Sequence, residues 1–367
     1  MKLKCNRQSF CEAVAVVSRA VSPRSSLPAL EGVLVRARSG GVDLFGYDLD
    51  TGISTHIDAA VEEPGEIVLT AKVLLDIVKR MPGDTVSLSV GERSLTELRS
   101  GMAEYTILGI PADEFPEFPQ VAEPTALSLA QNVLKSMIEQ TLFAVSQSDA
   151  KPVHTGSLFE VAQGNVTVVS VDGYRLALRK EQAKTDRDIK FIVPGKTLSE
   201  ISRILADSDE AAEILVSKKH IIFNIGSFSV YSRLLEGDFL DYRAAIPKSH
   251  NTTVRVAVRE FVDSIERTSL LISDRIKSPL RVSFQKEMIL LACSTSLGKA
   301  SDQTGAKLDG ETLEMGFNNR YLLDALRASG CDEVLLEISG ALSPMKIVPP
   351  EGDQFLFLVL PVRLKNE

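Results

Sequence analysis

The chain has 367 residues, of which 44% are hydrophobic and 25% charged, and its formal net charge is -8. This balance is typical of an ordinary soluble globular protein and excludes a disordered or low-complexity chain. The acidic charge argues against a protein whose whole surface grips nucleic acid, but it is compatible with a basic surface enclosed by an acidic shell.

The compartment is indicated by what the sequence lacks. No apolar run approaches the roughly 20 residues of a membrane helix, and the first residues lack the apolar core of a signal peptide. The four cysteines, Cys5, Cys11, Cys293 and Cys331, are too far apart for a zinc pattern and suit reduced, buried thiols. We therefore expect a cytoplasmic protein with no membrane contact.

The first predicted element is an amphipathic helix over residues 9–22. Phe10, Val14 and Val17 recur at spacings of three and four, while Glu12 and Arg19 lie off that stripe. The same stripe returns around residues 133–142 and again around residues 261–265. Alternating runs, such as residues 32–38, 165–170 and 280–284, predict strands with one buried face.

A second helix is predicted over residues 72–79, and its pattern returns over residues 196–203 and 320–327, a step of 124 residues each time. Each copy carries an acid at the same register: Asp76, Glu200 and Asp324. A repeat this long is a whole domain and not a solenoid unit. The chain therefore reads as one module used three times.

Other landmarks keep the same step. Asp48 falls 124 residues before Asp172, and Phe115 falls 124 residues before Phe239. Proline and polar residues interrupt the apolar pattern near residues 122 and 248, which predicts domains over residues 1–122, 123–248 and 249–367. Two helices packed on antiparallel sheets make each domain an α+β unit of about 120 residues.

Signatures of catalysis or of metal binding are weak. Pro194-Gly-Lys-Thr197 looks like the end of a phosphate-binding loop, but Lys190 stands where the first glycine is needed. The acids around Asp48 have calcium-loop spacing without the terminal Glu, so a turn role is favoured. His56, His154, His220 and His250 show no ligand spacing. We expect no catalytic residue, cofactor or metal, and no enzyme activity.

Five motifs together resemble a known family. They are Ser26-Leu-Pro-Ala-Leu-Glu-Gly-Val-Leu, Phe115-Pro-Glu-Phe-Pro, Val171-Asp-Gly-Tyr-Arg-Leu-Ala, Gly316-Phe-Asn-Asn-Arg-Tyr-Leu-Leu-Asp and Leu360-Pro-Val-Arg-Leu364. In this order and over the whole chain they are similar to the bacterial DNA polymerase III beta subunit, the replicative sliding clamp. The threefold repeat agrees with this resemblance independently.

The resemblance implies a head-to-tail homodimer that forms a ring of six domains around duplex DNA. Helices would line the hole, so DNA would be held by topology with weak, sequence-independent phosphate contacts. The clamp would tether the replicative polymerase and confer processivity. The expected DNA-facing residues, for which a merely solvated helix face is the alternative, are Arg24, Lys72, Lys79, Arg80, Lys196, Arg203, Arg320 and Arg327.

The resemblance also implies a peptide-binding pocket between the second and third domains. There the polymerase subunit, the clamp loader, and other replication or repair proteins would dock a short peptide. Core packing is the alternative for Leu176, Leu358 and Leu360. The expected lining is His154, Val171, Gly173, Tyr174, Arg175, Leu176, Leu240, Asn318, Tyr321, Leu342, Pro344, Leu358, Leu360, Pro361, Val362 and Arg363.

Three positions in this part of the sequence depart from the family pattern. His154 stands where an apolar residue is common, Tyr174 where His is common, and Ala244 where a basic residue is common. These departures bear on the peptide preference.

By position, ring closure would bring Leu271 and Ile272 against Tyr105 and Ile107 of the other chain, a heterologous contact that closes after two copies. Burial of these four residues within their own domains is the alternative. Two other functions stay open: an enzyme that binds a phosphate ligand at the Gly195 loop, and an interaction scaffold that never encircles DNA.

Overall fold

The computed structural model describes residues 1–119, 121–183, 187–273, 275–276 and 278–364. Residues 365–367, at the end of the third predicted domain, lie outside these ranges. The chain divides into two compact units, one of residues 1–132 and 200–234 and the other of residues 133–199 and 235–367. Among the described residues, no helix has the length and apolar character needed to cross a membrane.

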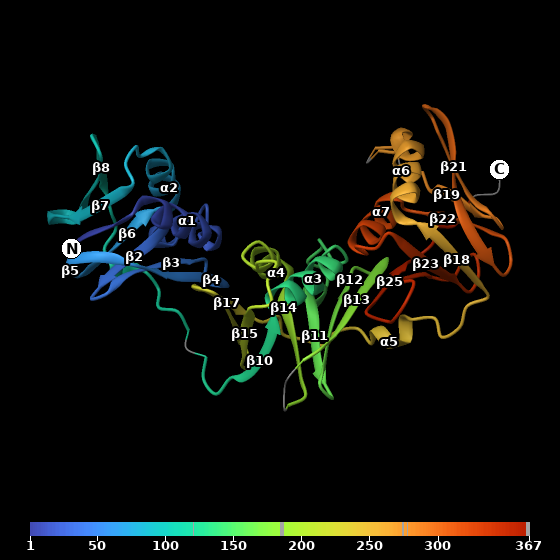
Figure 1. The fold of residues 1–367 in the computed structure, drawn as a ribbon, viewed down its shortest axis with the longest axis horizontal. Coiled ribbons are helices and arrows are strands. Elements are labelled where there is room, and N and C mark those ends of the chain that lie inside the picture. The colour runs from blue at the N-terminus through green and yellow to red at the C-terminus, as the bar shows by residue number, and fades with distance from the viewer. Residues whose placement is uncertain (120, 184–186, 274, 277, 365–367) are drawn as a thin grey trace. The chain divides into compact units, whose positions relative to one another are not determined.

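The first unit contains two antiparallel sheets. The first has the order β5-β1-β7-β8-β9, and the second has the order β10-β15-β16-β17-β4-β3-β2-β6. Figure 1 labels most of these strands. The strands are β1 (Lys2–Asn6), β2 (Gly32–Arg38), β3 (Gly41–Tyr47), β4 (Thr51–Ile57), β5 (Ala59–Glu63), β6 (Gly65–Thr70), β7 (Thr85–Val90), β8 (Leu95–Ser100), β9 (Ala103–Leu108), β10 (Thr125–Ala130), β15 (Ala211–Val216), β16 (His220–Ile225) and β17 (Phe228–Arg233).

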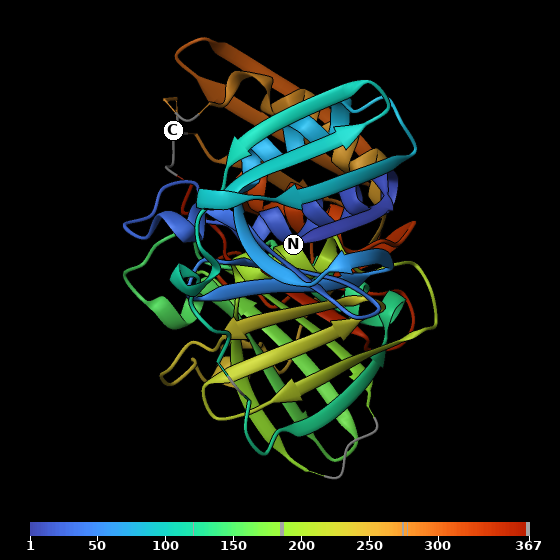
Figure 2. The same cartoon turned by 90° about the vertical axis from the view of Figure 1, so that its left-hand side faces the viewer.

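Helices α1 (Arg7–Val17) and α2 (Ala71–Arg80) pack against these sheets (Figure 2). The apolar stripe of each helix is buried, with Phe10 and Val14 in α1 and Leu74 and Val78 in α2. The first helix begins earlier than predicted, because the Asn6 side chain accepts a hydrogen bond from the Ser9 N–H at 3.0 Å and caps it. It also ends earlier: the Ser18 hydroxyl donates to the Val14 carbonyl, and the chain tightens into the 3₁₀ turn Ser18–Ala20.

The second unit contains one antiparallel sheet with the order β14-β11-β12-β13-β25-β24-β23-β18-β21-β20-β19-β22. Its strands are β11 (Gly156–Ala162), β12 (Asn165–Val171), β13 (Arg175–Gln182), β14 (Ile189–Pro194), β18 (Thr252–Ala257), β19 (Leu280–Phe284), β20 (Met288–Thr295), β21 (Gly298–Asp309), β22 (Leu313–Phe317), β23 (Glu333–Ile338), β24 (Met345–Val348) and β25 (Phe355–Val359).

The remaining helices supply the predicted pairs of the second and third copies. They are α3 (Gln131–Leu142) with α4 (Gly195–Ser202), and α6 (Val258–Thr268) with α7 (Asn319–Ala328). A short helix, α5 (Tyr242–Ala245), was not predicted and lies in the segment after β17. Short 3₁₀ turns occupy Pro28–Glu31, Glu92–Ser94, Ala112–Glu114, Pro152–Thr155 and Ser269–Leu271.

Neighbouring copies share sheets. Strand β17 of the second copy pairs with β4 of the first, and β25 of the third copy pairs with β13 of the second. β4, β13 and β21 are the fourth strands of their copies, and β9, β17 and β25 are the last. Each junction therefore joins the last strand of one copy to the fourth strand of the copy before it.

The four cysteines are free thiols, as predicted, but only Cys5 and Cys293 are buried. Cys11 and Cys331 are half-buried, so the expectation that all four are buried is wrong for these two. Cys11 occupies an intermediate position on α1, next to the buried Phe10 rather than on the stripe itself.

Candidate functional site

The turn between β12 and β13 is built by one carboxylate. Asp172 Oδ1 accepts hydrogen bonds from the backbone N–H of Tyr174 at 2.9 Å and of Arg175 at 3.0 Å, while Gly173 adopts φ 93°. Asp48 Oδ1 accepts in the same way from the N–H groups of Asp50 and Thr51. The predicted turn role of these acids is confirmed, and in the second copy the turn presents Tyr174 with 62% exposure.

Arg175 is held on several sides. Its Nε donates to Asp172 Oδ2 at 2.9 Å and its Nη1 to Asp324 Oδ2 at 2.5 Å. Its guanidinium lies 4.5 Å from the centroid of the Tyr321 ring, which stacks on Tyr174 at a centroid distance of 6.1 Å. With two carboxylates beside one cation, this part of the predicted groove has fixed geometry.

Apolar residues of the predicted groove fall into two groups. Leu176 and Leu358 pair across β13 and β25 and are 2% and 1% exposed, so both pack in a core cluster beneath the surface. Val171 is also buried. The exposed apolar members, which are the ones available for direct contact with a ligand, are Tyr174, Leu240, Leu342, Leu360 and Val362.

The other predicted members border this surface. Asn318 accepts a hydrogen bond from the Arg320 N–H and caps α7, and Leu360 donates its N–H to the Tyr174 carbonyl at 2.9 Å. Pro344 and Pro361 are half-buried, while Gly173 and Arg363 are exposed.

The segment after β17 packs beside this surface. The His154 ring meets the Phe239 ring edge to face at a centroid distance of 5.5 Å, and Phe239 packs against the cluster that contains Leu176, Leu358 and Tyr242. His154 is 9% exposed, and burial, followed by the nearby Lys151 charge, lowers its pKa below 6.5. His154 is therefore uncharged at neutral pH and serves as an aromatic wall.

All eight basic residues predicted to face DNA are exposed. Arg80 pairs with Asp76 at 3.2 Å, Arg203 with Glu200 at 2.9 Å, and Arg327 with Glu266. Arg24 lies in a loop that is shaped by local hydrogen bonds, including one from the Ser25 N–H to Glu31 Oε1 at 3.0 Å. Exposure suits both the DNA-facing role and the solvated alternative.

The four predicted dimer residues lie at the surface or partly buried. β9 is an edge strand of its sheet, and its Tyr105 is 38% exposed. Ile107, Leu271 and Ile272 are half-buried, and Ile272 packs in part against the core of its own unit. None of the four is fully buried within its own domain.

Gly195 begins α4 and fits tightly. A Cβ on this residue would lie 3.0 Å from both the Thr155 carbonyl oxygen and the Val145 side chain. Close packing therefore accounts for a glycine at this position without a phosphate ligand.

Comparison with known proteins decides the family. Models of the N-terminal, central and C-terminal domains of the DNA polymerase III beta subunit match residues 1–119, 128–241 and 243–363. The chain belongs to the DNA polymerase III beta subunit family. It therefore consists of three DNA-clamp domains.

Full-length relatives of this beta subunit are named beta sliding clamp. That of Bacillus subtilis strain 168 is 34% identical over 376 residues, covering 99% of this chain and 100% of the relative. One from Staphylococcus epidermidis is 33% identical over 374 residues, covering 99% of each chain. These relatives support a replicative sliding-clamp function.

Solved beta subunits have the same fold. The DNA polymerase sliding clamp of Bacillus subtilis matches with a TM-score of 0.96 at 34% identity and covers 100% of both chains. A clamp of Pseudomonas aeruginosa bound to griselimycin matches with a TM-score of 0.94 at 28% identity, covering 99% of this chain and 100% of that one.

Reasoning from the beta-subunit sequence missed several neighbours of the groove. Asp172 and Asp324 hold Arg175, and Glu160 binds Tyr242 and Arg243. Asp324 already stood out as a repeated acid, and Glu160 lies 124 residues after Arg36. Comparison of equivalent positions in the three copies would have marked both.

Proposed function

We propose that this chain closes as a head-to-tail homodimer, encircles duplex DNA and tethers the replicative polymerase subunit to it. We also propose domain boundaries at residues 1–122, 123–248 and 249–367, a site of action in the cytoplasm where bacterial DNA is copied, and a tethering role without catalysis.

The observation that carries ring closure is the use of strand edges. Within one chain the last strand of a copy joins the fourth strand of the copy before it, twice. Among the described residues, β9 pairs only with β8, and residues 298–305 of β21 pair only with β20. In the described part of the chain, the last strand of the first copy and the fourth strand of the third copy thus each keep an unpaired edge.

The two remaining edges complement each other. If β9 of one chain joins β21 of a second chain, the junction already made twice within each chain is repeated between the chains. This pairing would bring Tyr105 and Ile107 of one chain near Leu271 and Ile272 of the other. Such a heterologous contact forms a closed ring when the rotation closes after two chains. A discrete dimer of about 80 kDa, twice 40.0 kDa, follows.

Contact with DNA is proposed to be weak and electrostatic. Lys72, Lys196 and Arg320 are the second residues of α2, α4 and α7, so three equivalent cations recur along the chain. Phosphate contacts of this kind carry no sequence information and let a topologically trapped protein slide.

Partners are proposed to dock on the surface formed by Tyr174, Leu240, Leu342, Leu360 and Val362, with Arg175 at its polar end. Exposed Leu and Tyr side chains beside fixed polar groups suit a short peptide with apolar anchors. The polymerase subunit, the clamp loader, and other replication or repair proteins would share it. We propose that griselimycin, the ligand of the P. aeruginosa clamp, binds here as well.

The test is retention of the loaded protein on circular and on linear duplex DNA as salt is raised. An encircling ring stays on circles in high salt and leaves once they are cut, whereas charge alone releases both forms equally. Equal release would remove the ring and favour a scaffold that never encircles DNA.

A further inference from the structure

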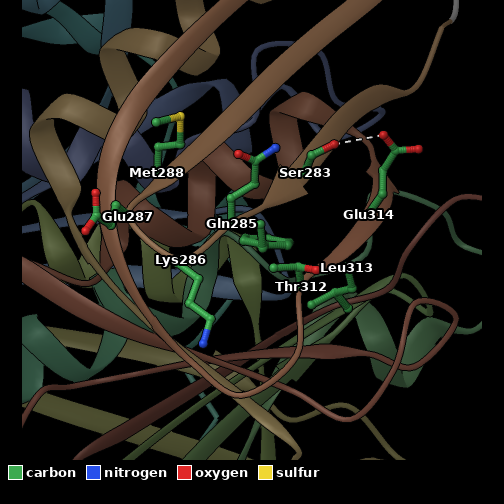
Figure 3. Close-up of a pocket in the computed structure, with 9 residues that line it drawn as sticks. Ser283, Gln285, Lys286, Glu287, Met288, Thr312, Leu313 and Glu314 are labelled. Carbon is green, nitrogen blue, oxygen red and sulfur yellow. Dashed lines mark hydrogen bonds between the residues drawn. The ribbon is translucent and has the colours of Figure 1, made fainter.

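One cross-strand pair recurs in all three copies with its charges changed. Arg36 faces Glu66 in the first copy, Glu160 faces Lys190 in the second, and Ser283 faces Glu314 in the third. The pairs are in contact at 2.9, 2.6 and 2.8 Å, the last shown in Figure 3. Of the three pairs, only that of the second copy places the carboxylate on the earlier of the two paired strands, β11.

The reversed pair in the second copy has additional partners. Glu160 Oε2 accepts a hydrogen bond from the Tyr242 hydroxyl at 2.6 Å and another from Arg243 Nη2. The Glu160 side chain is 8% exposed, so a carboxylate on a sheet face is almost covered by three donors. Two of the donors come from α5, some 80 residues later in the sequence.

Charge keeps this cluster intact. Burial alone would raise the pKa of Glu160, but hydrogen bonds from Lys190, Tyr242 and Arg243 outweigh it and lower the pKa to about 2. The carboxylate is thus ionised throughout the physiological range, and the Arg243 guanidinium also lies 4.6 Å from the centroid of the Tyr242 ring.

The first copy lacks this arrangement. Phe118 stands 124 residues before Tyr242 and has no hydroxyl, and it packs on Phe45 and Tyr47 at centroid distances of 5.5 and 4.9 Å. The first copy therefore has a cation, Arg36, and no hydroxyl at Phe118. The second copy has a carboxylate, Glu160, and a hydroxyl donor for it, Tyr242. Among the described residues of the three copies, a carboxylate at this position occurs together with donors from the following segment only in the second copy, beside the proposed groove.

Leu240 lies between the two fixed points of this segment. Phe239 is held by the His154 ring and by the cluster that contains Leu176 and Leu358, and Tyr242 belongs to the same cluster. Leu240 itself is 45% exposed. Its position therefore depends on the anchors on either side.

We propose that Glu160 is a positioning residue that anchors residues 239–246 through Tyr242 and Arg243 and thereby sets Leu240 as a wall of the peptide groove. The inference rests on the proposed peptide-binding function. A peptide with apolar anchors would then find its contact surface already ordered, which lowers the entropy lost on binding.

The test uses full-length variants and griselimycin as the probe, with affinity measured by calorimetry and order measured by amide hydrogen exchange of residues 239–246. Glu160→Gln and Tyr242→Phe should each weaken griselimycin binding by about tenfold to a hundredfold, the effect of a lost hydrogen bond to a charged group. Exchange over residues 239–246 should accelerate in both. The matched control, Arg36→Gln, breaks the equivalent pair in the first copy and should leave both readouts unchanged.

The outcomes separate this inference from the proposed function. If Tyr174→Ala loses binding while Glu160→Gln and Tyr242→Phe bind as wild type, the groove stands and the positioning role is overturned. If both variants weaken binding but amide hydrogen exchange of residues 239–246 is no faster than in wild type, the proposed anchoring of this segment by Glu160 is also overturned. If wild type does not bind, or Tyr174→Ala binds as tightly, the proposed groove itself is wrong and the positioning role falls with it.

Discussion

At the scale of single residues, Arg175 shows how distant parts of the sequence come to depend on each other. Its side chain is only 11% exposed, and it faces one carboxylate from its own turn and another from α7. A cation this far from water needs its partners, because an unpaired buried charge is strongly unfavourable.

Removing one partner of Arg175 should therefore lower the stability of the folded protein. We expect Asp324→Asn to lower the free energy of unfolding by about 1–3 kcal/mol, measured by urea denaturation. Asp76→Asn is the matched control, since Asp76 holds the same repeat position but pairs with Arg80 at the exposed surface. Equal losses in the two variants would contradict a special role for the Arg175 contacts.

His154 should make the free energy of unfolding depend on pH. Burial, then Lys151, lowers the pKa of His154 in the folded state, so the unfolded chain binds this proton more tightly. The free energy of unfolding should fall as pH drops from 7.5 to 5.5, through the unfolded value of 6.5. Glu160 adds nothing in this window, because its stabilisation is lost only as pH falls from 4.5 through about 2.

The control for this effect is His154→Leu, which keeps an apolar wall against Phe239. Its urea midpoints should vary less between the two pH values, with the remaining slope including His220, whose pKa burial also lowers. An unchanged slope would mean that His154 does not titrate as described.

At the scale of elements, the segments that follow β9 and β17 determine which sheet faces are apolar. Leu34 and Leu158 lie two residues before Arg36 and Glu160 and are buried in clusters that contain Phe115 in the first copy and Tyr242 in the second. The equivalent residue of the third copy, two before Ser283, is Arg281, which pairs with Glu314. At this equivalent position the side chain is thus apolar in the two copies whose sheet is covered by such a segment, and charged in the third copy.

Edge strand β9 should control assembly. Ile107→Asp would place a charge in the proposed contact with β21 and should convert a species near 80 kDa, twice 40.0 kDa, into a single chain by sedimentation equilibrium. Thr106→Asp changes the opposite face of the same strand and should keep the dimer. A dimer that survives Ile107→Asp would place the interface elsewhere.

At the scale of the whole molecule, an acidic chain can still hold DNA if its cations recur in equivalent places. The net charge is -8, yet Lys72, Lys196 and Arg320 stand at the same position of three related helices. In a ring, such repeated positions would present cations to the phosphates at regular intervals.

Charge removal should test this arrangement through salt dependence. Changing Lys72, Lys196 and Arg320 to Gln should flatten the plot of log affinity for linear duplex against log salt by about 0.9 for each lost phosphate contact. Lys2→Gln with Lys180→Gln is the control, since both lysines lie on strands and pair with carboxylates. Equal flattening by the control would contradict a specific role of Lys72, Lys196 and Arg320 in phosphate contact.

The sequence by itself determined the local structure and the repeat. The 124-residue step, the helix stripes and the turns at Asp48 and Asp172 all depend on residues close together in the chain, where periodicity and turn chemistry act directly. The family followed from motifs of the same kind. Burial was less predictable: Leu176 and Leu358 were expected to line the predicted groove, with core packing as the alternative, and the structure buries them in a core cluster.

Only the tertiary structure decided the long-range partners. Arg175 meets Asp324 across 149 positions, Glu160 meets Tyr242 across 82, and β17 joins β4 across the junction of two copies. A charged or hydroxyl-bearing residue carries no periodic signal that names its partner, because the partner is set by how whole sheets meet. The repeat therefore follows from neighbours in sequence, whereas the proposed anchoring of the groove depends on contacts between residues far apart in the chain.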